Sequence, residues 1–478
     1  MLLESCLTIK RIKMKNNFTL LILFMCAFSI SAQTTFTLDS TELTSRVVKD
    51  SIDIPWEIVW GPDDHIWMTE RFGRVSRVNP KTGNQQVLLD LSGEVYERSE
   101  TGMLGMALHP DFDNSPHVFI AYTYLSGNSI RERLVRFNYD GSQLIAADTL
   151  IENIIGNNTH VGARVIILPD NTLLMSTGDA QNRSLPQNKS SVVGKILRLN
   201  LDGSIPTDNP NPNSYVWSFG HRNAQGLWRA PNGKIYSSEH GPTTDDELNI
   251  VTAGGNFGWP DVEGFCDSPP ENVFCSANNV VEPLAAWTPT IAPSDIIWYS
   301  HPAIPELTDK LLMTVLKDKS LIAFEFNAAG DVLLNQTKYL KGDGDRLRDV
   351  CVSPDGKIYL ATNGASWSNS RPFSHSIIEL SNTAYYSNDT NTSSITVNST
   401  LDGIRVGPNP VVSGEALNLF IPRKEIGQFT MTDVVGRTVL SATVEGNTGM
   451  STEGLNGVYF WKLSLENGVA KEGKLVIH

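Results

Sequence analysis

The feature of this sequence that most constrains its fold is a short phrase that recurs about six times between residues 50 and 380. Each copy places a turn residue such as Pro, Asp, Asn or Gly before an alternating apolar and aromatic strand. The copies are residues 61–68, 109–122, 168–175, 230–236, 307–313 and 353–360. Helical periodicity is hard to find in this region, so the repeat predicts an all-β chain.

A second strand often follows the first, as in Gly73–Val78 and Gly194–Leu199. Copies spaced roughly 45 to 80 residues apart fit four-stranded blades joined by loops of variable length. The sequence therefore predicts a six-bladed β-propeller over residues 40–382. A two-sheet sandwich or a solenoid is the alternative.

The composition changes after the repeats. Residues 383–404 are rich in Asn, Ser and Thr, which is typical of a linker that cannot bury a core. Alternating strands return at residues 417–421, 429–433 and 457–463, and they predict a small β-sandwich domain over residues 405–478. Its Pro408-Asn409-Pro410 opening and its last strands resemble the C-terminal sorting domain of the type nine secretion pathway. That resemblance implies contact with the secretion machinery; a carbohydrate-binding or other interaction domain is the alternative.

The N-terminus has the layout of a cleaved export signal. A basic stretch at residues 10–15 precedes an apolar run at 18–28 and small residues that end near Ala32. We expect residues 1–32 to be removed, with Met14 as an alternative start, and the mature protein to be secreted or attached to the cell surface. A membrane anchor is disfavoured because a span needs about 20 apolar residues. The formal net charge of −14 argues against nucleic acid as a partner.

Removal of the signal would leave three cysteines. Cys266 and Cys275 lie close together in a loop rich in Pro, Asn and Ser, and in an exported chain this spacing predicts a disulfide. Cys351 lies between two valines and is expected to be a buried free thiol.

The densest group of polar, Gly and Pro residues covers 220–226, 238–249 and 254–260. Gly and Pro allow the backbone to approach a ligand and turn its carbonyls outward. We expect the carbonyls of Gly241 and Pro242 to be ligands of a calcium ion. Asp246 and Glu247, in an acidic run, are a second candidate calcium site, and a solvated acidic turn is the alternative.

Two further groups carry chemistry. His160 and Asp179 stand at the start and end of one expected hairpin, and a His with a carboxylate partner is a general base held in one tautomer. Lys317, Arg346 and Arg348 are cations on an acidic chain, and the two arginines alternate, so they point the same way from a strand toward one anionic ligand. The alternatives are a His that only fills a channel-side position and a salt-bridged surface.

Together, these groups resemble the pyrroloquinoline-quinone-dependent sugar dehydrogenases, which include soluble glucose dehydrogenase and the bacterial aldose sugar dehydrogenases. The matching phrases span about residues 45 to 382 and are 102–112, 160–164, 194–203, 220–226, 239–247, 255–260 and 346–349. The resemblance implies that an aldose is oxidised at its anomeric C1 hydroxyl to a lactone while hydride passes to the C5 carbon of the quinone. An external electron acceptor, not identified by the sequence, would reoxidise the cofactor.

The resemblance also implies roles for individual residues. His160 would remove the hydroxyl proton and Asp179 would orient it. Arg222 would stabilise the oxyanion that develops on the quinone, with Asn223 hydrogen-bonding nearby. The carboxylates of the cofactor would be gripped by Lys317, Arg346 and Arg348, and the calcium ion at Gly241 and Pro242 would act as a Lewis acid.

The chain departs from the glucose-oxidising branch of that family in several places. Glu100 stands where that branch has Gln, which makes it a candidate substrate-binding residue, and the loop after Asp179 is much shorter. The segment Trp287–Ser294 carries one extra residue, which bears on a stacking role of Trp287 against the cofactor. These differences fit the broader aldose branch. The alternative functions are a calcium-dependent propeller lactonase or esterase and a non-catalytic propeller that binds glycans or protein.

Overall fold

A computed structural model describes residues 6–13, 19–26, 34–340, 345–364 and 374–385, and towards the C-terminus residues 405–407, 416–420, 426–433, 437–445, 448–465 and 470–477. The chain divides into two compact units, Met1–Asn388 and Asp389–His478, which are described separately. At the N-terminus, β1 (Cys6–Lys13) pairs with β2 (Thr19–Cys26) in an antiparallel hairpin. None of the helices in these ranges is long and apolar enough to cross a membrane.

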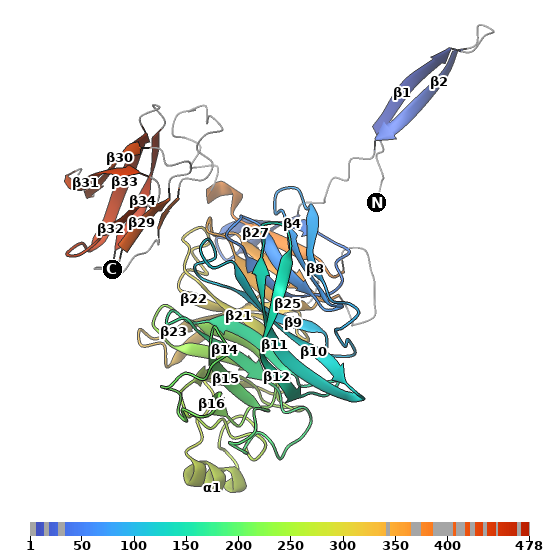
Figure 1. Cartoon of the computed structure of the whole chain (residues 1–478), viewed down its shortest axis with the longest axis vertical. Helices are drawn as coiled ribbons and strands as arrows, with labels where there is room; N and C mark the ends of the chain where they lie inside the picture. The colour runs from blue at the N-terminus through green and yellow to red at the C-terminus, as the bar shows by residue number, and fades with distance from the viewer. Residues whose placement is uncertain are drawn as a thin grey trace. The chain divides into compact units, whose positions relative to one another are not determined.

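The first unit is built from antiparallel sheets that follow one another along the chain (Figure 1). Three four-stranded sheets come first: β5 (Pro55–Trp60), β6 (Ile66–Glu70), β7 (Arg74–Val78) and β8 (Gln85–Asp90); β9 (Met103–Leu108), β10 (His117–Ser126), β11 (Ser129–Tyr139) and β12 (Leu144–Ile155); and β13 (Gly162–Ile167), β14 (Thr172–Thr177), β15 (Lys195–Asn200) and β16 (Val216–Phe219). Two more follow: β17 (Ala224–Arg229), β18 (Ile235–Glu239), β19 (Asp246–Val251) and β20 (Ala285–Trp287); and β21 (Pro293–Tyr299), β22 (Lys310–Val315), β23 (Ser320–Phe326) and β24 (Leu333–Tyr339). The predicted all-β chain of four-stranded sheets is confirmed.

The last sheet of the unit joins the two ends of the repeat region. It has the order β25 (Leu347–Val352), β26 (Ile358–Thr362), β27 (Ile377–Ser381), β4 (Thr41–Lys49) and β3 (Thr34–Leu38). The first strands of successive sheets contact one another in the order β5, β9, β13, β17, β21 and β25, and β25 contacts β5. The sheets therefore close a ring around their first strands.

Four of the six copies of the repeated phrase form the same turn. The N–H before the Pro donates to the carbonyl four residues later, in Gly61 to His65, Leu168 to Thr172, Ala230 to Lys234 and Ser353 to Lys357, at 2.8 to 3.0 Å. The fourth residue of each turn has a left-handed backbone, at Asp64, Asn171, Gly233 and Gly356. Asp, Asn and Gly tolerate that conformation best, which explains why the phrase recurs with these residues.

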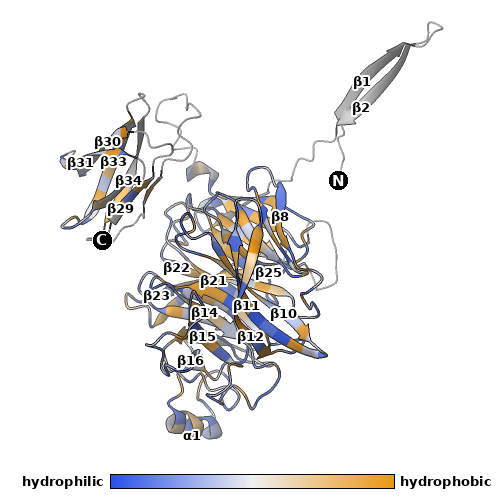
Figure 2. Cartoon of the chain, in the orientation of Figure 1, coloured by the Kyte–Doolittle hydropathy of each residue, from blue (hydrophilic) through white to orange (hydrophobic). Residues whose placement is uncertain are grey.

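The cores of the first unit lie between neighbouring sheets. One cluster joins Trp67 and Val75 of the first sheet to Met106 and Phe137 of the second, all nearly fully buried. Figure 2 shows how hydrophilic much of β11 is, and β11 intersperses buried residues such as Leu134 with partly exposed ones. Each sheet therefore needs its neighbour to bury an apolar face, which favours closure of the ring.

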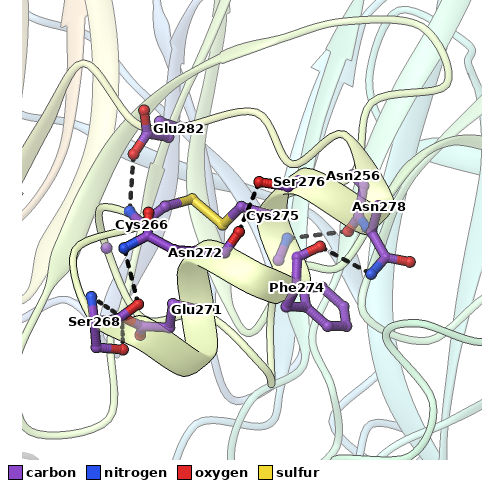
Figure 3. Close-up of a disulfide and its surroundings, with 12 residues drawn as sticks. Asn256, Cys266, Ser268, Glu271, Asn272, Phe274, Cys275, Ser276, Asn278 and Glu282 are labelled. Atoms are coloured by element: carbon purple, nitrogen blue, oxygen red, sulfur yellow. Dashed lines mark hydrogen bonds between the residues drawn. A yellow bond between two sulfur atoms is a disulfide. The ribbon is translucent and has the colours of Figure 1, made fainter.

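An excursion between β19 and β20 carries α1 (Pro269–Asn278), none of whose residues is buried. Ser268 begins the helix, and its N–H and hydroxyl both donate to the carboxylate of Glu271. The predicted disulfide between Cys266 and Cys275 is present and ties the helix to the loop before it (Figure 3). Cys351 is a buried free cysteine, as predicted.

The second unit contains two antiparallel sheets. One has the order β28 (Arg405–Gly407), β29 (Ala416–Phe420) and β32 (Thr448–Ser451), and the other has the order β31 (Thr438–Glu445), β30 (Ile426–Asp433), β33 (Gly457–Leu465) and β34 (Ala470–Ile477). Leu417 and Leu419 of the first sheet share one buried core with Phe429 and Leu463 of the second. The Pro408-Asn409-Pro410 opening and most of the predicted linker lie outside the described residues.

Candidate active site

The residues with candidate roles lie beside the first strands of the sheets. Glu100 precedes β9, His160 precedes β13, Arg222 and Asn223 precede β17, and Arg346 and Arg348 stand at the start of β25. Because these first strands are neighbours in the ring, segments far apart in the sequence meet at one end of it. The ring thus gathers side chains that no single sheet could bring together.

His160 and Asp179 form a close pair. Nδ1 of His160 lies 2.7 Å from Oδ1 of Asp179, and the Asp179 side chain is almost completely buried. Burial alone would raise the pKa of Asp179, but hydrogen bonds from His160, the backbone N–H of Gln181 and the indole of Trp259 outweigh it and lower the pKa. Asp179 is therefore a carboxylate anion that faces the imidazole.

Arg222 fixes the tautomer of His160. Its Nη2 lies 3.1 Å from Nε2 of the imidazole, and a guanidinium has only donors. Nε2 therefore accepts, and the proton of the neutral ring sits on Nδ1, where it is donated to Asp179. A base with its lone pair at Nε2 and a carboxylate behind it is arranged to take a proton.

The segment that holds Arg222 is anchored by a buried carboxylate. Glu239 accepts hydrogen bonds from the backbone N–H groups of Arg222 and Asn223, and it also pairs with Nδ1 of His221. The Arg222 side chain also donates to the carbonyl of His240 at 3.0 Å. Burial lowers the pKa of Arg222, so an anion beside it would stabilise the charged guanidinium.

A pocket that is partly open to solvent, with about 420 Å³ of space not filled by atoms, lies beside His160 and Asp179. Its lining residues come from several of the sheets and are Trp56, Glu100, Val161, Gly162, Gln225, His240, Leu316, Arg346 and Arg348. Burial lowers the pKa of His240 to about 3, so its ring is neutral. Val161 and Gly162 directly follow His160, so the backbone of His160 continues into the pocket wall.

Two guanidiniums face this pocket. Burial, with the neighbouring charges of Arg346 and Arg164, lowers the pKa of Arg348 to about 9, and burial also lowers the pKa of Arg346. Arg348 is held by Gln225 Oε1 at 3.1 Å and lies 5.8 Å from the ring of Trp56. Two cations brought together out of water suit a ligand that carries more than one carboxylate.

Glu100 also lines the pocket. Its Oε2 accepts the backbone N–H of His160 at 2.8 Å and lies 3.5 Å from Nδ2 of Asn223. His160 has a left-handed backbone, with φ of 58°, an uncommon conformation for a residue other than Gly. The Glu100 carboxylate thus holds the strained segment that presents the candidate base.

Lys317 and Trp287 are not among the pocket residues. Lys317 is exposed, and its Nζ donates to the Thr290 hydroxyl at 2.8 Å. The Trp287 indole packs in the core beside Phe324, and its N–H donates to Gln336 at 3.2 Å. The structure therefore does not bring Trp287 to the pocket wall, because its ring fills the space between two sheets.

The candidate calcium-binding residues differ in their surroundings and hydrogen bonds. The loop with Gly241 and Pro242 begins at His240, which lines the pocket. The Asp246 carboxylate accepts three backbone N–H groups, from Gly241, Ile291 and Ala292, at 2.6 to 2.8 Å. Such a carboxylate holds the loop in place, which is a structural use of the residue.

Glu247 accepts from the Asn249 amide and from the N–H of Gly264, both at 2.9 Å. Burial and the nearby charge of Glu239 raise its pKa to about 8. Within the described ranges, no three side chains of His, Cys, Asp or Glu are grouped to hold a metal ion. A cation at Glu247 would therefore need backbone carbonyls or water as its other ligands.

Sequence reasoning missed several residues of the site. Trp259 donates to Asp179, while Trp56 and Gln225 line the pocket and contact Arg348. Trp259 follows the phrase Gly255–Gly258, but its indole partner lies 80 positions away in the sequence. A sequence motif can indicate that such a residue belongs to a site, but it does not show which distant residue its side chain contacts.

The comparisons with known proteins agree with this geometry. Residues 52–368 match the model of the family described as Glucose / Sorbosone dehydrogenase, and the chain belongs to this family. That span contains every residue of the pocket. The resemblance drawn from the motifs is confirmed at the level of the family.

Individual relatives are similar over most of their length. Quinoprotein glucose dehydrogenase B of Acinetobacter calcoaceticus is 30% identical over 413 residues, which cover 68% of this chain and 86% of the relative. Aldose sugar dehydrogenase YliI of Escherichia coli is 29% identical over 341 residues, covering 67% and 90%. The PQQ-bound aldose sugar dehydrogenase of Streptomyces coelicolor superposes with a TM-score of 0.62 at 30% identity, covering 73% of this chain and 98% of that one.

Proposed function

We propose that this protein oxidises the anomeric C1 hydroxyl of aldose sugars to lactones, with pyrroloquinoline quinone as cofactor. The single observation that carries the proposal is the proton acceptor at His160 Nε2, oriented by Asp179, beside a pocket that Arg346 and the buried Arg348 line. The family and its quinoprotein relatives support the same reaction class.

The two arginines of the pocket suit a cofactor with several carboxylates. Arg346 and Arg348 would hold those carboxylates. Lys317 is exposed and directly follows Leu316, which lines the pocket, so its side chain would reach the carboxylates from the rim. The quinone, when bound, supplies the acceptor for the C1 hydride. We propose that the carbonyls of Gly241 and Pro242 hold a calcium ion beside it, and that Glu247 contributes to a second calcium site.

Residues of this chain would carry out the proton transfer and the charge stabilisation. His160 Nε2 takes the proton of the C1 hydroxyl, and Asp179 stabilises the imidazolium that forms. Arg222 stabilises negative charge that develops at the edge of the pocket, and Asn223 fixes the segment on which Arg222 stands. Glu100 would use its side-chain oxygens to accept hydrogen bonds from hydroxyl groups of the sugar.

We also propose finer features of the architecture. The ring that closes when β25 contacts β5, completed by the N-terminal strand β4, supports a six-bladed β-propeller. The basic and apolar pattern of residues 1–32 supports export, and the motifs of residues 405–478 support a sorting domain that directs the protein to secretion or to the cell surface.

The test is dye reduction by purified apo-protein with a panel of aldoses, with and without added quinone and calcium, together with a titration of quinone binding. Activity that needs both additions is the expected result, and it would also rank the sugars. Failure to bind quinone would overturn the cofactor assignment and favour a lactonase or a binding propeller.

A further inference from the structure

Trp259 forms a hydrogen bond to Asp179, the carboxylate that pairs with the candidate base His160. Its indole N–H donates to Oδ2 of Asp179 at 2.9 Å, while Oδ1 of the same carboxylate accepts from His160 Nδ1 at 2.7 Å and from the Gln181 N–H at 2.7 Å. Each carboxylate oxygen therefore has its own donor. The indole is the partner that prevents the carboxylate from rotating away from the imidazole.

Trp259 is itself held on several sides. Its ring lies 5.3 Å from the guanidinium of Arg222 and 4.3 Å from that of Arg183, distances typical of cation–π contacts. Its backbone N–H donates to Gly220 at 3.0 Å, and its carbonyl accepts from the Gln187 amide at 2.9 Å. A side chain fixed at both backbone and ring can fix a third group in turn.

We propose that Trp259 is a positioning residue for the reaction: its indole N–H orients the Asp179 carboxylate toward His160, and its ring supports Arg222 on the other side of the same imidazole. The catalytic part of this inference rests on the proposed function. Its physical core, the control of His160 through Asp179, can be measured in the apo-protein.

The direction of the effect follows from the environment of Asp179. The carboxylate is nearly completely buried, so an oxygen that loses its donor is left unsatisfied. The anion would then depend more on the imidazolium, and the pKa of His160 would rise. The other charged or titratable groups near His160 are Arg222, Glu100 and His240, and a Phe at position 259 adds no charge to them and keeps an aromatic ring beside Arg222.

The experiment uses Trp259→Phe, which removes the N–H and keeps an aromatic ring. The pKa of His160 is measured by NMR in apo-protein with labelled histidine, and His160→Gln identifies the signal among the nine histidines. We expect an upward shift of about one pKa unit, because a hydrogen bond to a charged group contributes about that much. An unchanged pKa would overturn the proposal.

Trp217 provides a matched control. Its ring also carries an arginine, with Arg198 at 4.9 Å, but in the part of the chain that the structure describes its buried indole nitrogen has no hydrogen-bond partner. Trp217→Phe should therefore leave the pKa of His160 unchanged. A shift as large as that of Trp259→Phe would show a general loss of rigidity and would sink the proposed role.

A second measurement covers the case in which Trp259→Phe fails to fold. The indole N–H resonance of Trp259 in the otherwise intact protein should move when Asp179→Asn replaces the acceptor, and an unmoved resonance would overturn the contact. In holoenzyme, Trp259→Phe should lower kcat several-fold with little change in KM and move the acid limb of the pH profile upward. Because the NMR results need neither quinone nor sugar, they fail independently of the proposed dehydrogenase activity.

Discussion

In this protein, Nδ1 of His160 lies 2.7 Å from Oδ1 of Asp179, and the two residues flank the open end of the hairpin formed by β13 and β14, where Gly162 pairs with Thr177. The contact is possible because His160 adopts a left-handed backbone and because Glu100, from the preceding sheet, holds its N–H. A base assembled in this way should be sensitive to its neighbours and dispensable for holding the cofactor.

Replacement of His160 by Ala should abolish most turnover and leave quinone binding nearly intact. General-base catalysis contributes about 10²–10⁴-fold, so kcat should fall by that factor. The check is steady-state dye reduction alongside a fluorescence titration of quinone. His109→Ala, which lies outside the pocket, is the control. Turnover that survives in His160→Ala would remove this residue from the mechanism.

Replacement of Arg348 by Ala should mainly weaken the cofactor complex. A charge-assisted hydrogen bond contributes about 1.5–3 kcal/mol, so quinone affinity should fall roughly 10- to 150-fold. Calorimetric titration of apo-protein measures the affinity directly. The control is Arg74→Ala, which removes an exposed arginine that pairs with Asp90 at 3.0 Å. Equal affinities in both variants would count against a role of Arg348 in binding.

Glu57 should make stability depend on pH. It lies buried beside Arg164, at 2.6 Å, with Asp349 and Asp295 around the same guanidinium. Burial raises the pKa of Glu57 from 4.5 to about 8, because it disfavours the charged form. A raised pKa in the folded state gives stability that is fully present below 4.5 and is lost as pH rises through about 8.

Glu57→Gln replaces the carboxyl with an amide that does not titrate. Urea unfolding at pH 5 and pH 8 should therefore show a smaller loss of unfolding free energy in the variant, with a difference on the order of a few kcal/mol. Glu42→Gln, at an exposed position, serves as the control. Identical pH slopes for wild type and Glu57→Gln would show that this carboxyl does not titrate as described.

Loss of the disulfide should loosen the excursion around α1 and spare the site. A bridge between residues nine positions apart stabilises by about 2–3 kcal/mol, chiefly by restricting the unfolded loop. The double variant Cys266→Ala/Cys275→Ala should be cut faster by protease between residues 261 and 284, yet bind quinone normally. Cys351→Ala keeps the bridge and should be cut like wild type. Equal resistance in all three proteins would contradict this role.

The sequence alone determined the features that depend on local chemistry. The turns at Gly61, Leu168, Ala230 and Ser353 follow from Asp, Asn and Gly at positions that need a left-handed backbone. The Cys266–Cys275 bridge follows from the close spacing of the two cysteines in a loop rich in Pro, Asn and Ser. Motif order was also enough to indicate the family.

Tertiary structure decided which side chains meet. Arg222 reaches Nε2 of His160, and Trp259 reaches Asp179, only because closure of the ring brings the ends of different sheets together. The same packing directs Trp287 into the core between two sheets. Contacts of this kind depend on how distant segments are placed relative to one another, and a local pattern of residues carries no information about that placement.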